Sequence, residues 1–237
     1  MINLILIRHG QSQWNLENRF TGWYDADLTQ KGIEEAKKAG LLIKELGIKF
    51  NYGFTSFQTR AIKTFDTILK TSEINIPNIT KAWQLNERHY GGLQGLNKEE
   101  TAKKHGQEQV MIWRRSYDIP PPPQDRKDPE HPVNSKIYKE IDPNLIPDSE
   151  SLKDTYERVI DFYKQKIEII NDKNILISAH GNSIRALCKY LFNLNNNEIS
   201  KLEIPTGNPL VIEMNNEKKI LGAKYLDSNR AKDLLVF

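Results

Sequence analysis

Two short apolar runs dominate the hydrophobic pattern of this chain and predict buried strands. Residues 3–7 (Asn-Leu-Ile-Leu-Ile) and 174–178 (Asn-Ile-Leu-Ile-Ser) are apolar at both alternations. Such runs are typical of parallel strands that helices cover on both faces. Shorter strands are predicted at residues 52–55, 80–85, 210–214 and 220–225.

Between these runs, apolar residues recur at helical spacing. Thr29 can cap a helix that ends at Gly47, and Ser151 with Asp154 resembles a capping box that opens another. Asn182 or Ser183 can start a further helix. The first helix has an apolar face made of Ile33, Ala36, Gly40 and Ile43. A second helix, over residues 61–69, has the apolar face Ala61, Ile62, Phe65, Ile68 and Leu69. The helix after Ser151 has the apolar face Leu152, Thr155, Tyr156, Val159, Ile160, Tyr163 and Ile167.

Strands that alternate with helices predict the α/β class, as a three-layer sandwich with a mostly parallel central sheet flanked by helices. We expect a single domain over residues 1–237 with a short tail after residue 225. One segment breaks the rhythm: residues 119–146 hold four successive prolines and mixed charge with few apolar side chains. This segment is expected to be a long surface excursion, either a solvated loop or a lid over a site.

Charge and cysteine content narrow the class of function. The formal net charge is +3 with both signs interspersed, which argues against nucleic-acid binding through a basic stripe. The single cysteine, Cys188, excludes an internal disulfide and a four-cysteine zinc site and is expected to be a small buried hydrophobe. With no basic leader and no apolar stretch of membrane-spanning length, we expect a soluble, cytoplasmic protein that does not bind membranes.

Two histidines follow directly on the two main strands. Arg8-His9-Gly10 comes after the first and His180-Gly181 after the later one. Because the carboxyl ends of parallel strands face the ligand crevice, the two imidazoles can meet there. A neutral imidazole can attack phosphorus and hold the group as phosphohistidine. Cations for the phosphoryl oxygens are then needed, and the candidates are Arg8, Arg60, Lys98, Arg114 and Arg115.

A third polar cluster, Glu87-Arg88-His89-Tyr90-Gly91-Gly92-Leu93, follows a predicted strand. Burial raises the pKa of a carboxyl group, whereas neighbouring cations lower it. Glu87 could therefore exchange a proton with a substrate hydroxyl or form a structural salt bridge, and its environment alone leaves both open.

Several long blocks resemble the family of cofactor-dependent phosphoglycerate mutases, within the histidine phosphatase superfamily. The resemblance extends to about Met214 and rests on residues 6–15 (LIRHGQSQWN), 18–23 (NRFTGW), 27–29 (DLT), 87–98 (ERHYGGLQGLNK), 113–123 (WRRSYDIPPPP), 147–155 (PDSESLKDT) and 177–186 (ISAHGNSIRA).

The resemblance implies a role for each candidate. His9 matches the phosphorylated nucleophile, His180 the second histidine that stabilises the transferring group, and Glu87 the general acid/base. Arg8 and Arg60 match the arginines that hold that group. The positions that match contacts to substrate phosphate, carboxylate or the transferred group are Arg8, Asn15, Thr21, Gly22, Arg60, Glu87, Arg88, Tyr90, Lys98, Arg114, Arg115, Gly181 and Asn182.

By the same resemblance, the expected reaction interconverts 3-phosphoglycerate and 2-phosphoglycerate in glycolysis and gluconeogenesis. It would be an isomerase (an intramolecular phosphotransferase) that 2,3-bisphosphoglycerate primes, without a metal. The expected partners are small phosphoglycerates and a second copy of the chain in a homodimer. Asn208 departs from the family pattern where an apolar residue is expected, and we expect it to affect packing near the site.

Three alternatives remain. A phosphatase or a bisphosphoglycerate synthase would use the same histidine chemistry, although Lys98 and the 113–123 block favour the mutase. A non-catalytic phosphate-binding protein would be expected to lack His9, Glu87 or His180. A metal-dependent enzyme is disfavoured because the five histidines include no helical ligand pair, and His105 and His131 are expected to be solvated.

Overall fold

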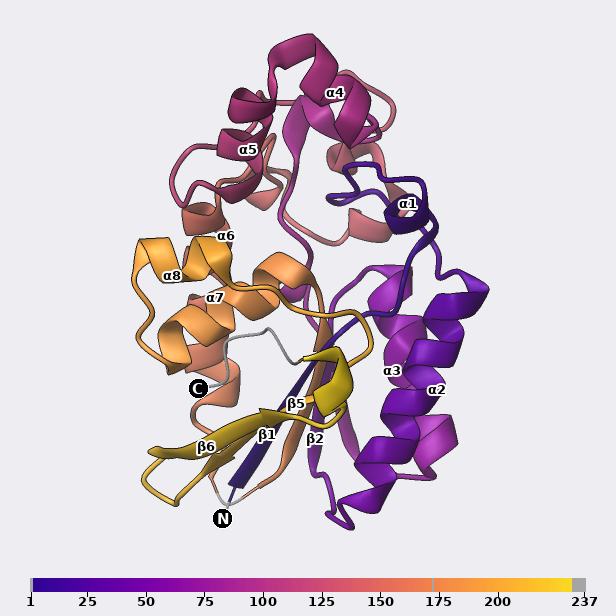
Figure 1. Ribbon diagram of the computed structural model, residues 1–237, viewed down its shortest axis with the longest axis vertical. Coiled ribbons are helices and arrows are strands. Elements are labelled where there is room, and N and C mark those ends of the chain that lie inside the picture. Colours follow the sequence, from indigo (N-terminus) through magenta and orange to yellow (C-terminus); the bar gives the residue numbers. More distant parts are fainter. Residues whose placement is uncertain (1, 172, 232–237) are drawn as a thin grey trace.

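The computed structural model describes residues 2–171 and 173–231, which fold around one six-stranded sheet (Figure 1). The strands are β1 (Ile2–Arg8), β2 (Tyr52–Thr55), β3 (Asn78–Lys81), β4 (Ile175–Ala179), β5 (Leu210–Met214) and β6 (Ile220–Tyr225). Their order is β3-β2-β4-β1-β5-β6, in which the first four are parallel and β5 is antiparallel to both of its neighbours. The prediction of a mostly parallel sheet is confirmed.

Helices cover both faces of this sheet. The α-helices are α1 (Gln13–Leu16), α2 (Gln30–Glu45), α3 (Thr59–Ser72), α4 (Lys98–His105), α5 (Gln107–Arg115), α6 (Leu152–Phe162), α7 (Gly181–Leu191) and α8 (Asn196–Lys201). Helices α2 and α3 lie on one face, and α6 and α7 lie on the other (Figure 1). Alternate residues of β1 enter the two cores: Ile5 and Ile7 join the core under α2 and α3, and Leu4 and Leu6 the opposite one. This is why β1 is apolar at both alternations.

Local signals placed the ends of these helices well. Thr29 caps α2 by accepting the Gly32 N–H, and Gly47 follows its end with a φ of 64°. The Ser151–Asp154 capping box is present at α6, which continues as a π-helical turn over Tyr163–Ile167. Helix α7 begins at Gly181, one residue before the predicted start, because His180 itself is the N-cap residue.

The strand predicted at residues 80–85 is confirmed only at its first two residues, because β3 spans Asn78–Lys81. Strand β3 ends at Lys81, and the chain turns into a 3-10 helix over Trp83–Leu85. The Ala82 N–H still donates to the Thr55 carbonyl oxygen, so the chain leaves the sheet at that point. Leu85 is fully buried, which explains its apolar character without a strand.

The Pro-rich excursion at residues 119–146 is packed rather than loose. It contains the 3-10 helices Pro132–Asn134, Lys136–Tyr138 and Pro143–Leu145. Tyr138 is buried against Trp23, and its hydroxyl donates to the Trp23 carbonyl oxygen at 2.6 Å. His131 is completely buried, so the prediction that it is solvated is wrong, whereas His105 is exposed as expected. A lid function for the excursion stays a prediction.

Helices α4 and α5 stand beyond the carboxyl ends of the parallel strands, together with α1 (Figure 1). These helices cover the edge of the sheet at which β1 and β4 end. Cys188 in α7 is buried as predicted, and burial raises the pKa of its thiol to about 12. Across residues 2–171 and 173–231, no helix is both long and apolar enough to cross a membrane.

Candidate active site

His9 and His180 lie side by side because the strands before them are neighbours in register. Arg8 pairs with Ala179 in the sheet, and the His9 N–H donates to the Ala179 carbonyl oxygen at 3.0 Å. The ring centroids are 5.0 Å apart with the rings tilted by 58°. His9 is 2% exposed and His180 is fully buried. The predicted convergence of the two imidazoles is confirmed.

The tautomer of His9 follows from a hydrogen bond of its ring. Its Nδ1 lies 2.7 Å from the Gly10 carbonyl oxygen, which can only accept a hydrogen bond. Nδ1 therefore carries the proton, and Nε2 keeps its lone pair. Burial, followed by the charges of Arg60 and Arg8, lowers the pKa of His9 well below its ordinary value. The ring is neutral at pH 7 and has the form that a nucleophile needs.

His180 is oriented by a hydroxyl group. Its Nε2 lies 2.7 Å from Ser56 Oγ, and Ser56 Oγ also accepts the Gln58 N–H at 3.1 Å. Burial and the charge of Arg60 lower the pKa of His180. Sequence reasoning missed Ser56, although it directly follows β2 as His9 follows β1, so the same strand-end rule would have found it.

Two guanidinium groups accompany the histidines and are held by carbonyl oxygens. Arg60, in the first turn of α3, donates to the Gly22 and Tyr24 carbonyl oxygens at 2.9 and 2.8 Å. Arg8 donates to the Ile204 carbonyl oxygen at 2.8 Å. Among the described residues, the buried Nε of each arginine has no hydrogen-bond partner. Both groups thus keep donor capacity for an anion.

Glu87 lies where it can exchange a proton with a ligand. Its Oε1 accepts N–H groups from Arg88 at 2.9 Å and from Asn182 at 3.1 Å. Burial opposes ionisation, but these hydrogen bonds and the charges of Arg8 and Arg60 outweigh it, so the pKa of Glu87 is lowered. The carboxylate is therefore ionised at neutral pH and can act first as a base.

Two connected hollows open above this group of side chains. The inner pocket, about 380 Å³, is lined by Arg8, His9, Asn15, Arg19, Phe20, Thr21, Gly22, Arg60, Glu87, Tyr90 and Lys98. The outer pocket, about 510 Å³, is lined by Arg8, Glu87, Tyr90, Lys98, Arg114, Arg115, Gly181, Asn182, Arg185 and Glu203. The two share Arg8, Glu87, Tyr90 and Lys98.

Two predicted site residues, His180 and Arg88, line neither pocket. His180 lies against the His9 ring, whereas Arg88 has a supporting position. It is fully buried, donates to the Arg114 carbonyl oxygen at 3.0 Å, and lies over the Tyr90 ring at 4.6 Å. Burial raises the pKa of Tyr90, but the charge and hydrogen bond of Arg88 and the charge of Lys98 together outweigh it and lower the pKa to about 8. Burial lowers the pKa of Lys98 as well. Through these contacts, Arg88 supports the positions of Tyr90 and α5.

Two residues of the outer pocket were not predicted. Arg185 donates to the Asn182 side-chain oxygen at 3.2 Å and to Glu203 at 3.4 Å. Glu203 also forms an ion pair with Arg115. Arg185 could have been found from its position, one helical turn after Asn182 on the helix that follows His180. Glu203 lies in a loop with no local motif, so only the tertiary structure shows it.

The glycine after His9 serves the packing of a helix. A Cβ atom on Gly10 would lie 2.1 Å from the Gly32 carbonyl oxygen, and one on Gly32 would lie 2.1 Å from the Gln11 carbonyl oxygen. Helix α2 therefore contacts the turn after β1 backbone to backbone. Close approach of α2 is therefore the structural reason for a glycine at position 10.

A metal role finds little support in the arrangement of donors. Within the described ranges, no group of three or more His, Cys, Asp or Glu side chains is arranged to hold a metal ion. The metal-independent chemistry stays a prediction. The guanidinium nitrogens of Arg8 and Arg60 that lack a hydrogen-bond partner among the described residues instead fit an anionic ligand.

Comparison with known proteins agrees with this geometry. The family model of the histidine phosphatase superfamily (branch 1) matches residues 4–131 and 125–224. The 2,3-bisphosphoglycerate-dependent phosphoglycerate mutase of Pelagibacter ubique (strain HTCC1062) is 57% identical over 239 residues, with 100% of both chains covered. The 2,3-bisphosphoglycerate-dependent phosphoglycerate mutase 2 of Lactiplantibacillus plantarum is 52% identical over 229 residues, with 95% of this chain and 99% of that protein covered.

A solved structure supports the fold. The alpha-ribazole phosphatase from Shigella flexneri aligns with a TM-score of 0.68 over 94% of each chain at 20% identity, which bears on the architecture alone. The matched family model and the full-length relatives together carry the assignment. The chain belongs to the histidine phosphatase superfamily and, within it, to the family of 2,3-bisphosphoglycerate-dependent phosphoglycerate mutases.

Proposed function

We propose that this protein interconverts 3-phosphoglycerate and 2-phosphoglycerate through a phosphohistidine at His9. The observation that carries the proposal is the neutral His9 ring, with Nε2 bare, beside His180 at the base of an arginine-lined pocket. The full-length relatives that bear the mutase name point to the same reaction.

The inner pocket is suited to phosphoryl transfer. Nε2 of His9 attacks phosphorus as the bond from phosphorus to the substrate oxygen breaks, and that oxygen takes its proton from Glu87. Arg8, Arg60 and His180 stabilise the equatorial oxygens of the phosphoryl group during the transfer. Because both arginines are fixed by carbonyl oxygens rather than by carboxylates, their charge is not neutralised by a contacting acid. Asn15, Thr21 and Gly22 lie along the same pocket and can position the group.

Glu87 supplies the proton chemistry between the two pockets. As a carboxylate, it removes the proton from the substrate hydroxyl that receives the phosphoryl group, and it returns a proton in the reverse step. Its position in the lining of both pockets suits a substrate whose carbon chain lies between them.

The outer pocket can hold the parts of the substrate that do not react. Lys98, Arg114 and Arg115 bring positive charge for a carboxylate or a second phosphate, and Tyr90, Gly181 and Asn182 add hydrogen-bonding groups. When bound, 2,3-bisphosphoglycerate would supply the phosphoryl group that primes His9. A cytoplasmic location and a homodimer remain part of the proposal and rest on the family resemblance.

The decisive experiment is a brief incubation with 2,3-bisphosphoglycerate, followed by mapping of acid-labile phosphate. The acid-labile phosphate should map to His9. The variant His9→Ala should lose both this phosphate and about three orders of magnitude or more of mutase activity. His105→Ala, at the exposed end of α4, is the matched control. Phosphate on another residue, or normal turnover in His9→Ala, would refute the mechanism.

Activity assays distinguish a mutase from a phosphatase or a synthase that uses the same histidine chemistry. Isomerisation of 3-phosphoglycerate should exceed release of phosphate from 2,3-bisphosphoglycerate, because the cations of the outer pocket retain the intermediate. If phosphate release dominates, the protein is a phosphatase that uses the same histidine.

A further inference from the structure

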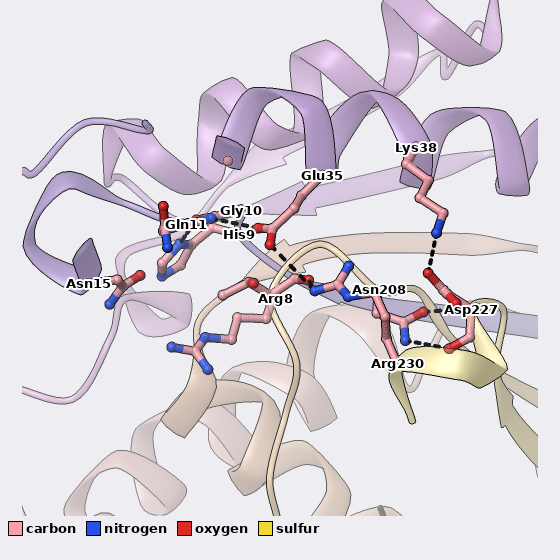
Figure 2. Close-up of polar contacts among 12 residues, drawn as sticks. Arg8, His9, Gly10, Gln11, Asn15, Glu35, Lys38, Asn208, Asp227 and Arg230 are labelled. Carbon is pink, nitrogen blue, oxygen red and sulfur yellow. Dashed lines mark hydrogen bonds and ion pairs between the residues drawn. The ribbon is translucent and has the colours of Figure 1, made fainter. Parts of the chain in front are cut away.

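One peptide unit beside the nucleophile is held at both of its ends. Its carbonyl belongs to Gly10 and accepts the His9 Nδ1–H at 2.7 Å, whereas its N–H belongs to Gln11 and donates to Glu35 Oε2 at 2.8 Å (Figure 2). Because a peptide unit is planar, rotation of the N–H carries the carbonyl with it. The group that holds the Gln11 N–H therefore also aims the oxygen that orients His9.

We propose that Glu35 is a positioning residue for His9. Its carboxylate fixes the Gly10–Gln11 peptide so that the carbonyl keeps the imidazole in the Nδ1–H tautomer and leaves Nε2 bare. The proposal rests on the proposed function of His9 as the nucleophile. No local motif connects Glu35 with His9, since it lies 26 positions further along the chain on α2.

The chemistry of a carboxylate suits this role. A hydrogen bond to an ionised acceptor is shorter and about twice as strong as one between neutral groups. It also polarises the peptide, so that the Gly10 carbonyl oxygen becomes a better acceptor for the Nδ1–H. The side chain of Glu35 is 12% exposed, which limits competition from water.

The other hydrogen bonds of the turn involve the flanking peptide units and not the Gly10–Gln11 peptide. Thr64 Oγ1 accepts the Gly10 N–H at 3.1 Å, and the Thr29 N–H donates to the Gln11 carbonyl oxygen at 2.9 Å. These bonds fix the flanking peptides, and the Gly10–Gln11 unit itself is bonded to His9 and Glu35. Removal of the carboxylate would free the N–H end while the helix contact at Gly32 stays in place.

Glu35 is itself held by the C-terminal segment. Arg230 Nη2 lies 3.4 Å from Glu35 Oε1 and donates to the Thr206 carbonyl oxygen at 2.6 Å (Figure 2). A Cβ atom on Gly207, whose φ is +57°, would lie 2.6 Å from the Glu35 Cβ, so the chain presses closely against the stem of this side chain. Thr206 also forms a bridge with Arg8.

Asn208 ties this segment down. Its side-chain amide donates to the Asp227 carbonyl oxygen and accepts the Asp227 N–H, both at 3.0 Å. Lys38 forms an ion pair with the Asp227 carboxylate (Figure 2). Asn208 is 1% exposed. The polar residue at an expected apolar position thus anchors the chain that carries Arg230, rather than simply packing near the site.

The test compares Glu35→Ala and Glu35→Gln with wild type, and Glu34→Ala is the matched control. Glu34 is the neighbouring carboxylate on α2, is 56% exposed and pairs with Lys37. We expect Glu35→Ala to lower kcat about tenfold with KM within about twofold, because only the nucleophile is misplaced. Glu35→Gln keeps an oxygen acceptor and should recover kcat to within about threefold.

A nitrogen NMR measurement reads the tautomer directly. In unphosphorylated wild type, His9 should show a protonated Nδ1 and a bare Nε2, with its signals assigned from a His9→Asn sample. Glu35→Ala should mix the two tautomers, whereas Glu34→Ala should not. If Glu35→Ala only lowers Tm and leaves both kcat and the tautomer unchanged, Glu35 is a structural residue and the proposal is wrong.

The two proposals can fail separately. If wild-type protein takes no phosphate on His9 from 2,3-bisphosphoglycerate, the proposed function fails. The tautomer measurement needs no substrate and still decides whether Glu35 positions the ring.

Discussion

The floor and the roof of the site are built in different ways. The floor consists of Arg8, His9, Arg60 and His180, which lie at strand ends or in the first turn of a helix behind a strand. The roof consists of Lys98, Arg114 and Arg115 on α4 and α5. Hydrogen bonds from the sheet fix the backbone of the floor to its neighbours, as between His9 and Ala179.

The roof residues are placed by side-chain contacts instead. Arg115 pairs with Glu203, which is 51% exposed, and Lys98 lies over the Phe20 ring at 5.9 Å. Contacts of this kind are weaker and easier to rearrange than a sheet. The comparison suggests that the floor sets the rate of chemistry and the roof sets affinity.

The largest effect is expected at Glu87, which lies between floor and roof. Glu87→Gln keeps the acceptor for the Arg88 and Asn182 N–H groups but cannot take a proton. We expect kcat to fall about 10²–10⁴-fold with little change in KM, as measured by steady-state kinetics. Glu99→Gln, an exposed carboxylate on α4, should leave both unchanged. A large rise in KM at nearly normal kcat would make Glu87 a binding residue.

How much of the fold the sequence predicts depends on whether the signal is local in the sequence or comes from tertiary contacts. Strands β1 and β4 and the caps of α2 and α6 were predicted to within a residue or two because their signals are local: continuous apolar runs, Thr29 and the Ser151 box. The strand prediction at residues 80–85 fails after residue 81 because Leu85 is apolar on account of its burial in the tertiary structure. A buried side chain gives the same pattern whether or not it lies in a strand.

The site shows the same limit. The meeting of His9 and His180 followed from strand ends, but Ser56, Arg185, Glu203 and Glu35 were not singled out. Glu203 and Glu35 each contact a partner distant in sequence, Arg115 and the Gln11 N–H respectively. His131 was expected in solvent because its neighbours are polar and proline-rich, yet it packs against His89 with ring centroids 5.8 Å apart. Neither the amino-acid composition nor the hydrophobic periodicity of the sequence indicates that contact.

The burial of His89 against Trp23 and His131 predicts a pH effect on stability. Burial lowers the pKa of His89 from 6.5 to about 3. Between these values the unfolded chain binds a proton that the folded chain does not, so the free energy of unfolding falls as pH falls below 6.5. For one such histidine the loss between pH 7 and pH 5 is roughly 2 kcal/mol.

Denaturant titrations at pH 7 and pH 5 check this effect. His89→Asn keeps an acceptor near the Gly91 N–H, which His89 Nδ1 accepts at 2.8 Å, and should lose roughly 2 kcal/mol less than wild type over that interval. His105→Asn, on the exposed end of α4, should follow the wild-type slope. Equal slopes in all three proteins would mean that His89 takes up a proton in the folded state.

A roof residue should change affinity more than rate. Arg115→Ala removes a cation from the outer pocket, and we expect KM for 3-phosphoglycerate to rise about tenfold with kcat within about threefold. Arg126→Ala makes the same change in net charge in the exposed part of the excursion and should leave KM unchanged. If kcat falls as much as kcat/KM does, Arg115 acts on the transition state and belongs with the floor.

The smallest effect is expected at Glu203, whose carboxylate pairs with Arg115 and Arg185. A substrate carboxylate must compete with Glu203 for Arg115, so Glu203→Gln should lower KM up to about threefold at unchanged kcat, most clearly at low salt. Because the Glu203 carboxylate is half-exposed, its ion pair with Arg115 contributes about 1 kcal/mol at most, so Tm should change by only a few degrees. Glu213→Gln, a half-exposed carboxylate 4.0 Å from Lys224 on the neighbouring strand, is the control. A rise in KM would show that Glu203 holds Arg115 in its binding position, which would make part of the roof as preorganised as the floor.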